Sequence, residues 1–272
     1  MMRSLWTSAS GMTAQMLNID TVTNNIANVN TTGYKRERLE FHTLLYETMQ
    51  RADLDPVNMT GRPVNLQVGH GVRPVATTRI FTQGSLQRTD RPMDMAIEGA
   101  AFFEIRTNFD EFRYTRDGSF QLMPLEDGTL MLTTSDGFPI MSTDGEEIIL
   151  PEGLTERDVN VSYEGILTAM IDGVAEDLGF QIRIVQFANP NGLEGIGGNL
   201  LMETIASGPP LSEADGETNR ISRLVQGYLE MSNVSIAEEM IGMITAQRAF
   251  DTNSKGITTS NEMLQTANQL VR

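Results

Sequence analysis

Both ends of the chain carry apolar residues at a strict seven-residue interval, and this repeat restricts each end to a helix that packs along its length. The N-terminal row consists of Leu5, Met12, Ile19 and Ile26. The C-terminal row consists of Ile236, Met243, Phe250, Ile257, Leu264 and Val271. Apolar residues at this interval form the seam of a coiled-coil helix. The sequence therefore predicts one long helix at each end.

Turn and capping signals set the boundaries of these two helices. Asparagines recur between residues 24 and 30 and favour turns, and Gly33 can adopt backbone conformations that are closed to most residues. We therefore expect residues 1–35 to form a helix that ends in a turn of defined conformation. Ser235 and Glu238 match a capping box, which places the start of the second helix near residue 236.

The apolar stripe is narrow on the C-terminal helix. The positions four residues after its apolar row become polar at Gln247, Ser254, Asn261 and Asn268. A simple two-stranded coil needs apolar residues there, so we expect this helix to pack among several others. An intramolecular two-helix stalk is the alternative. The predicted assembly interface comprises both apolar rows together with Asn25, Asn28, Gly33 and Tyr34.

Length and composition exclude several classes of protein. The 272 residues suggest about two domains, and the absence of cysteine excludes disulfides and thiolate metal sites. No run of 18 apolar residues is present, and the first residues lead directly into an amphipathic pattern. We therefore expect neither membrane insertion nor a cleavable signal peptide. A protein of this kind would leave the cytoplasm by a route that reads no such signal.

The negative charge is concentrated in the middle of the sequence. Residues 92–217 hold 5 basic and 24 acidic side chains, a balance of −19 within a total of −16, whereas both ends are nearly neutral. Nucleic acid and anionic membranes are poor partners for such a surface. The acidic block is expected to be a solvated exterior.

Between the helices the pattern changes from irregular to β. Residues 36–71 are expected to be a connecting segment with an extended arm at 47–69, whose Arg51 and Arg62 are candidate contact residues. Over residues 72–190 short strands are punctuated by Asp-Gly pairs, which favour hairpin turns, and an antiparallel barrel or sandwich is expected. Residues 191–235 then return to the helix at 236–272. The predicted class is α+β, with one helical module that is discontinuous in sequence.

Residues that could carry out chemistry are scarce. His42 and His70 are isolated and lack metal-ligand spacing. The acidic pairs at 126–127 and 146–147 lie in or beside Asp-Gly turns, where a structural role is expected. We predict no catalytic residue, cofactor or metal.

Several motifs resemble those of the bacterial flagellar rod and hook proteins, the axial family of the flagellum. Residues 24–28 read Asn-Asn-Ile-Ala-Asn and residues 32–35 read Thr-Gly-Tyr-Lys, as in the N-terminal signature of that family. Residues 226–234, 238–240 and 247–250 are similar to its C-terminal end. Residues 71–74, 114–120, 192–194 and 199–200 resemble the distal-rod branch, and the likeness covers nearly the whole chain.

The resemblance implies a structural role. It implies subunits that are exported by the flagellar type III apparatus and polymerise into a rigid helical tube across the periplasm, transmitting torque from motor to hook. Paired terminal helices would line the tube, and the β domain would face outward inside the surrounding bushing rings. Proximal rod subunits and hook or hook-adjacent subunits would be its neighbours. The arm occupies the place of a distal-rod insertion but differs in composition, with charged residues such as Asp53 and Asp55 beside its arginines.

Two other functions are alternatives. A proximal rod or hook subunit would share the terminal motifs, and the arm at 47–69 distinguishes these subunits from the distal rod. A rod-borne hydrolase would need a pocket with paired carboxylates of perturbed pKa.

Overall fold

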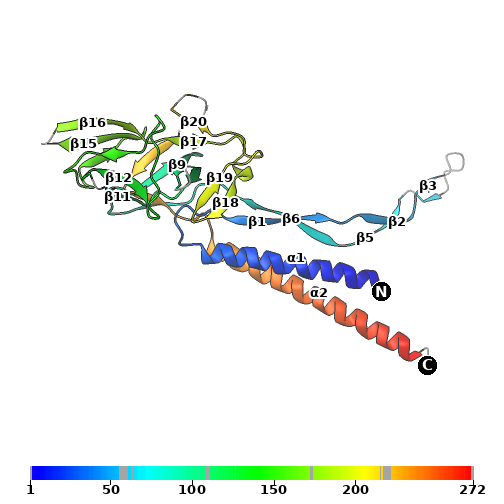
Figure 1. Cartoon of the computed structure of the whole chain (residues 1–272). Coiled ribbons are helices and arrows are strands. Elements are labelled where there is room, and N and C mark those ends of the chain that lie inside the picture. Colours follow the sequence, from blue (N-terminus) through cyan, green and yellow to red (C-terminus); the bar gives the residue numbers. More distant parts are fainter. Residues whose placement is uncertain are drawn as a thin grey trace. The chain divides into compact units, whose positions relative to one another are not determined.

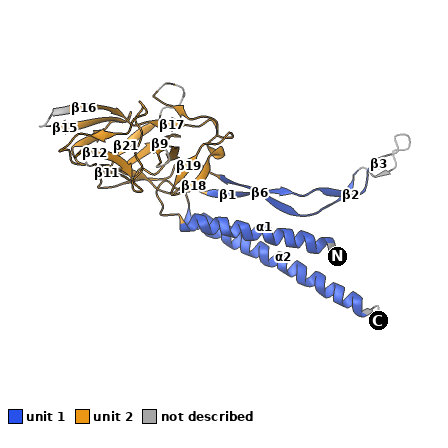
Figure 2. Ribbon diagram, viewed as in Figure 1, with its two compact units in different colours: residues 1–27, 37–78, 235–272 blue, residues 28–36, 79–234 orange. Residues whose placement is uncertain are grey.

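The computed structural model describes residues 2–54, 61–62, 64–107, 111–125, 127–171, 174–214, 216 and 222–270. Two long helices and many short strands make the chain α+β, as predicted (Figure 1). The chain divides into two compact units (Figure 2). Unit 1 contains residues 1–27, 37–78 and 235–272, and unit 2 contains residues 28–36 and 79–234.

Unit 1 combines the helices with a β ribbon. Its helices are α1 (Met2–Ala27) and α2 (Ile236–Leu270), and α2 begins where the capping-box motif predicts. In the ribbon, β1 (Glu37–Thr43) pairs with β6 (Val72–Arg79), β2 (Tyr46–Gln50) with β5 (Leu66–Gly69), and β3 (Asp53–Leu54) with β4 (Gly61–Arg62).

The ribbon contains the arm expected at residues 47–69 and gives it a strand pairing that the sequence did not predict. Its described residues form paired strands, and residues 72–78 belong with these strands and the helices instead of with the β-rich domain expected at 72–190. Residues 72–78 belong to this unit because β6 pairs with β1, which lies about thirty residues earlier in the chain. A reading of local turn signals cannot detect such a pairing.

Unit 2 consists of open sheets. The largest has the order β18 (Glu194–Gly197), β19 (Leu200–Met202), β10 (Phe112–Thr115), β9 (Phe102–Arg106), β17 (Ile184–Gln186) and β20 (Leu211–Ser212). One three-stranded sheet contains β11 (Phe120–Pro124), β12 (Leu130–Thr134) and β13 (Ile149–Leu150), and another contains β14 (Val159–Val161), β15 (Ile166–Ile171) and β16 (Val174–Gln181). The two remaining pairs are β8 (Met95–Glu98) with β21 (Arg223–Gln226) and β7 (Leu86–Arg88) with β22 (Tyr228–Glu230).

None of the described sheets closes into a barrel, which was one of the two expected β architectures. The segment 191–235, expected only to return the chain to its second helix, supplies five of these strands, β18 to β22. A short 3-10 helix, η1 (Pro190–Gly192), spans the start of this segment. The strands in this segment have only two to four residues, too few to show an alternating pattern.

The core of unit 2 lies on both faces of β9. Phe103 and Ile105 belong to the larger hydrophobic cluster, whereas Phe102, on the opposite face, belongs to a second cluster with Tyr114 and Phe187. Successive residues of a strand point to opposite faces, so the burial of residues 102–105, Glu104 included, covers both sides of this strand. This arrangement makes β9 the central strand of the unit.

The Asp-Gly pairs serve two different structural purposes. Gly128, Gly137 and Gly145 have positive φ angles, as expected for tight turns. Gly118 does not, but a Cβ atom there would lie 1.6 Å from the carbonyl oxygen of Met95. At this position glycine is needed for close backbone packing.

Candidate assembly interface

The terminal helices of unit 1 run antiparallel, and α2 contacts α1 along most of the length of α1. The Ser4 Oγ atom, near the start of α1, lies 3.2 Å from Ser260 Oγ, near the end of α2. At the other end, Asn25 Nδ2 donates a hydrogen bond of 3.1 Å to Glu239 Oε2. These two contacts fix the register of the pair.

Small residues let the two helices approach closely between these ends. A Cβ atom on Gly11 would lie 2.9 Å from Asn253 Nδ2, and one on Gly256 would lie 3.0 Å from Ser8 Oγ. These contacts and the register define a seam with alternating spacings of three and four residues. The seam residues are Ser4, Ser8, Gly11, Gln15, Asn18, Val22 and Asn25 of α1, with Glu239, Gly242, Ala246, Ala249, Asn253, Gly256 and Ser260 of α2.

The two apolar rows found in the sequence therefore do not form the seam within the chain. Most of their residues follow a seam residue by one position, as Leu5 follows Ser4 and Phe250 follows Ala249, and Ile236 and Leu264 continue the row at the same seven-residue interval. In an antiparallel pair, the positions that follow the seam residues lie on the same side of both helices. The register thus places both rows side by side on one flank. We call them the apolar stripe: Leu5, Met12, Ile19 and Ile26 of α1 with Ile236, Met243, Phe250, Ile257 and Leu264 of α2.

The apolar stripe is incompletely covered in the single chain. Most of its residues are half-buried, whereas Ile236 and Leu264 are 49% and 38% exposed. Its outer edge is more open, since Met16 and Met240 are 53% and 54% exposed. Val271, which was also predicted for this interface, lies outside the described residues.

The β ribbon contacts α1 on the other flank of the seam. The Val72 backbone N–H donates to Ser10 Oγ at 3.4 Å. A Cβ atom on Gly71 would lie 2.2 Å from the same oxygen and 3.4 Å from the Cα atom of Thr7. Thr7 and Ser10 lie away from the apolar stripe on the helical surface, so the ribbon leaves the stripe open.

The polar residues predicted for the interface stabilise the end of α1 and the following turn. The buried side chain of Asn25 donates to the Glu37 carbonyl at 2.8 Å and accepts from the Glu37 N–H at 2.9 Å. In unit 2, Asn28 Oδ1 lies 3.2 Å from Thr31 Oγ1, and the Tyr34 N–H donates to the Thr31 carbonyl. Gly33 has φ +68, and a Cβ atom there would lie 2.7 Å from the Asp117 nitrogen.

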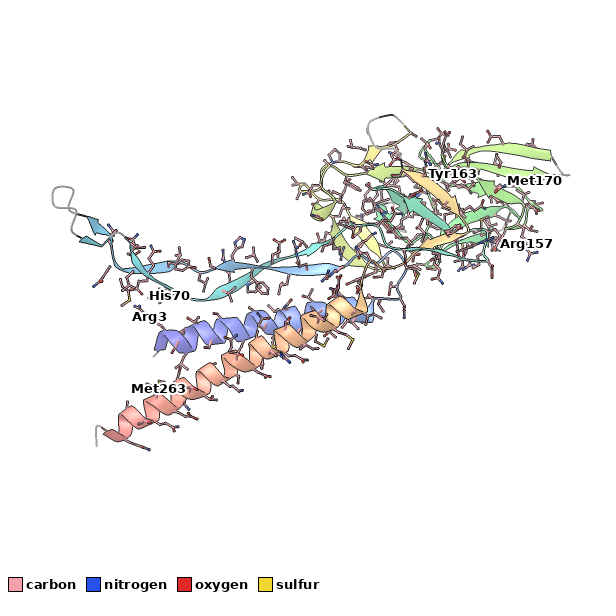
Figure 3. The ribbon with its side chains drawn as sticks, turned by 180° about the vertical axis from the view of Figure 1, so that it is seen from behind. Arg3, His70, Arg157, Tyr163, Met170 and Met263 are labelled. Atoms are coloured by element: carbon pink, nitrogen blue, oxygen red, sulfur yellow. The ribbon has the colours of Figure 1, made fainter. Side chains whose placement is uncertain are left out.

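The two arm arginines have no described side-chain contact. Arg51 is exposed beyond β2, and Arg62 lies in β4, where its side chain is outside the described part. The base of the arm is instead tied to α1 by Glu47, whose Oε2 atom lies 2.6 Å from Arg3 Nη2 and 3.6 Å from His70 Nε2 (Figure 3).

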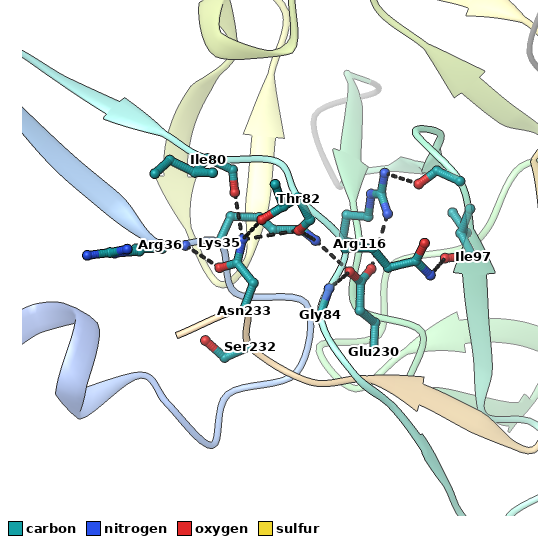
Figure 4. Close-up of polar contacts among 12 residues, drawn as sticks. Lys35, Arg36, Ile80, Thr82, Gly84, Ile97, Arg116, Glu230, Ser232 and Asn233 are labelled. Carbon is teal, nitrogen blue, oxygen red and sulfur yellow. Dashed lines mark hydrogen bonds and ion pairs between the residues drawn. The ribbon is translucent and has the colours of Figure 1, made fainter. Parts of the chain in front are cut away.

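A buried ion cluster in unit 2 joins the segments that lead to both helices (Figure 4). Lys35 follows the turn after α1, Glu230 precedes α2, and Arg116 comes from the β core. Glu230 Oε1 lies 2.5 Å from Lys35 Nζ, and Oε2 lies 3.1 Å from Arg116 Nη1. All three side chains are at most 3% exposed. The backbone N–H of Gly84 is a third donor to the carboxylate, at 2.8 Å.

The surroundings of the two cations compensate in part for their burial. Lys35 Nζ also donates to the Thr82 carbonyl at 2.9 Å, and Arg116 lies 5.0 Å from the ring centroid of Phe102. Burial nevertheless lowers the pKa of Lys35 and that of Arg116, while the Glu230 carboxylate raises both. The Glu230 carboxylate is therefore the group that opposes the effect of burial on the pKa of both cations.

Asn233 provides a second link between the same two segments. Its Oδ1 atom accepts from the Arg36 N–H at 2.7 Å, and its Nδ2 atom donates to the Ile80 carbonyl at 2.7 Å (Figure 4). Sequence reasoning missed this residue and the ion cluster, because their members are far apart in the chain. It also missed the seam, although the repeat of small residues was visible in the sequence.

The described residues contain little that favours catalysis. Burial raises the pKa of Glu104, with Arg183 acting in the opposite direction, but this carboxyl lies within β9. No three His, Asp or Glu side chains in the described ranges are placed to hold a metal ion. Neither described helix is long and apolar enough to cross a membrane.

Family models match three parts of the chain. Residues 5–35 match the flagella basal body rod protein family, residues 96–169 the D1 domain of the flagellar hook protein FlgE/F/G, and residues 225–270 the C-terminal region of the flagellar basal body rod FlgEFG proteins. Together they define the class as that of the flagellar rod and hook proteins.

Relatives that match over the whole chain specify the branch of this class to which the chain is similar. The chain is 48% identical to the flagellar basal-body rod protein FlgG of Borreliella burgdorferi, with 100% of each chain covered. It is 43% identical to the FlgG protein of Buchnera aphidicola from Acyrthosiphon pisum, over 99% of this chain and 100% of the relative, and 36% identical to that of Bacillus subtilis, over 97% of each. The chain belongs to the flagellar basal-body rod protein family, and its place is the bacterial flagellar basal body.

Proposed function

We propose that this chain polymerises through the apolar stripe into the rigid tube of the distal rod. The main support for this proposal is that both apolar rows lie on one flank of the helix pair, whereas the seam between the two helices contains mainly small and polar residues. Fully burying a large aliphatic or aromatic side chain contributes about 1.5–3 kcal/mol. Neighbouring helix pairs would supply this burial.

The proposal includes the partners that the family resemblance implies. Subunits pass through the type III export apparatus, assemble across the periplasm between proximal rod and hook subunits, and turn inside the bushing rings. The acidic block 92–217 faces outward. The chain acts as a structural subunit that transmits torque, with no enzymatic reaction of its own.

Electron microscopy of the concentrated, purified chain tests the proposal. We expect helical tubes, because the same stripe is present on every copy and a head-to-tail contact that does not close into a ring generates a filament. A chain that remains monomeric at all concentrations in conditions that preserve its fold would contradict polymerisation through its own surface.

A second expectation concerns the helices before assembly. Their seam contains mainly small and polar side chains, whose burial does little to offset the cost of ordering the backbone, about 1–2 kcal/mol per residue. In the monomer we expect fast hydrogen exchange at Ile19 and Ile257 and slow exchange at Met95 to Ile97, which are buried in unit 2. Slow exchange at both isoleucines in the monomer would show that the helix pair is stable alone.

The arm is proposed to stiffen the tube by holding an axial neighbour at a point away from the helices. Its described apolar residues are open to solvent, with Met49 56%, Val64 72% and Leu66 53% exposed. Exposed ion pairs of Arg51 or Arg62 would add only about 0–1 kcal/mol each. Apolar contacts are therefore expected to dominate, and repetition along the tube multiplies them.

Deletion of residues 51–67 tests this role. We expect a folded, exported subunit whose tubes bend more readily, because the helices and unit 2 are retained while the outer contact is lost. The persistence length of negatively stained tubes measures the effect. Tubes as straight and stiff as those of the parent chain would rule out stiffening by the arm.

A further inference from the structure

The β ribbon of unit 1 is held to α1 at two points that lie far apart on the helix. Near the C-terminal end of α1, the Asn25 side chain bonds to the backbone of Glu37, the first residue of β1, at 2.8 and 2.9 Å. Near the N-terminal end, Arg3 Nη2 lies 2.6 Å from Oε2 of Glu47 in β2. Asn25 lies 22 residues after Arg3, and Glu47 lies ten residues after Glu37. At about 1.5 Å per helical residue and about 3.3 Å per strand residue, both paths span roughly 33 Å, so the ribbon and the helix are matched in length.

The residues of α1 that contact the ribbon near the N-terminal end lie on one face of the helix. Arg3, Thr7 and Ser10 are spaced by four and three residues, so they are neighbours on the helix surface. The Val72 N–H donates to Ser10 Oγ at 3.4 Å, and a Cβ atom on Gly71 would lie only 2.2 Å from this oxygen. The ribbon backbone therefore lies directly against the helix here, which fixes its position along α1.

Glu47 supplies α1 with a negative charge that the first turn of the helix lacks. This turn contains Arg3 and no acidic residue. A cation in the first turn opposes the helix dipole, whereas a carboxylate near it is favourable. The same Glu47 Oε2 atom also lies 3.6 Å from Nε2 of His70, on the returning side of the ribbon (Figure 3). One carboxylate thus joins the helix to both sides of the ribbon where the arm begins.

We infer that Glu47 is a positioning residue, which fixes the direction in which the arm leaves α1. This role rests on the proposed stiffening of the tube by the arm, because an arm that holds a neighbouring subunit must itself be held. A two-stranded ribbon is at best marginally stable alone in water, so it depends on the helix for support. Exposed ion pairs contribute little to stability. Here, however, the matched lengths and the close contact at Gly71 bring the charged groups together, and the ion pair is needed only to select one direction of the arm.

Charge reversal and its rescue test this role in the full-length chain. The chain contains no cysteine, so Thr13→Cys in α1 and Gln50→Cys in β2, both at exposed positions, can carry a pair of spin labels. Labelled chain is diluted into tubes of unlabelled chain with the same charges, so that the measured distance lies within one subunit. Glu47→Arg places two cations at ion-pair distance, and we expect the distance distribution to widen at least about twofold. Adding Arg3→Glu restores opposite charges and should return the narrow distribution of the parent.

Glu40→Arg is the matched control, because Glu40 forms an ion pair within the ribbon, with Arg38 Nη2 at 3.5 Å. Its reversal should leave the distribution narrow. A broad distribution in the parent tubes, a narrow one for Glu47→Arg, or a broad one that Arg3→Glu fails to narrow would each overturn the positioning role. Tubes of Glu47→Arg that are as stiff as the parent despite a broad distribution would contradict stiffening by the arm. Failure of the unaltered chain to polymerise would overturn the proposed function instead.

Discussion

Replacing Glu230 with alanine is expected to lower the free energy of unfolding of unit 2 by about 3–5 kcal/mol. The carboxylate accepts from Lys35, Arg116 and the Gly84 N–H, and its side chain is fully buried. Its removal leaves two buried cations without a counter-charge. Breaking a buried ion pair by removing one member costs more than the pair contributes, because the remaining charge has lost its water and gained nothing in return.

The measurement is thermal and denaturant unfolding of the full chain, followed by far-ultraviolet circular dichroism. Glu164→Ala is the matched control, since it removes an exposed glutamate from the same unit and should change the stability by at most about 0.5 kcal/mol. A triple variant with Lys35→Met, Arg116→Met and Glu230→Leu should recover much of the loss, because no charge is then left buried. Equal melting of the Glu230→Ala and Glu164→Ala variants would contradict this account of the cluster.

The position of the cluster in the chain gives it a mechanical consequence. Residues 28–36 follow α1, and residues 230–234 lie shortly before α2. Lys35 and Glu230 bind these two segments to each other, and Arg116 binds them to the β core. A load carried by either segment is therefore shared with the other and with the core of unit 2, which suits a subunit that transmits torque.

The sequence was sufficient to predict the two helices and the α+β class, because both depend on patterns that repeat locally. The seven-residue rows are long, and the capping signal at Ser235 lies next to the helix it starts. The ribbon could not be predicted in this way, because β1 pairs with a strand about thirty residues away. The buried ion cluster was equally hidden, since Lys35, Arg116 and Glu230 meet only once the chain has folded.

The large apolar residues that dominate the sequence pattern differ from the residues that bring the two helices together within the chain. A search of the sequence for large apolar residues identifies the surface whose burial would contribute the most free energy. Within this chain, however, the two helices pack closely at Gly11 and Gly256, because these residues have no side chain that would hold the helix axes further apart. The distance between packed helices depends on the side chains at the contact. The small seam forms within the chain, and the large apolar residues of the stripe are those that we propose for contacts between chains.

Replacing Ile257 with aspartate is expected to abolish assembly while leaving the melting of unit 2 unchanged. Ile257 is half-buried beside the seam, and the register places it opposite Leu5 in the apolar stripe. A carboxylate there would have to be buried without a partner when a neighbouring helix pair packs on the stripe, and burial of an unpaired charge is strongly unfavourable. Since the isoleucine belongs to unit 1, the core of unit 2 loses no contact.

Thr258→Asp is the matched control, because it adds the same charge one residue later, at an exposed position on the outer side of α2. Sedimentation and electron microscopy should show tubes for this variant and only soluble subunits for Ile257→Asp. In cells that carry a single version of the protein, the control should swim and Ile257→Asp should not. Normal motility with Ile257→Asp would refute assembly through the apolar stripe. If both variants fail to assemble, the defect would follow from negative charge anywhere on α2, and the stripe would lose its special role.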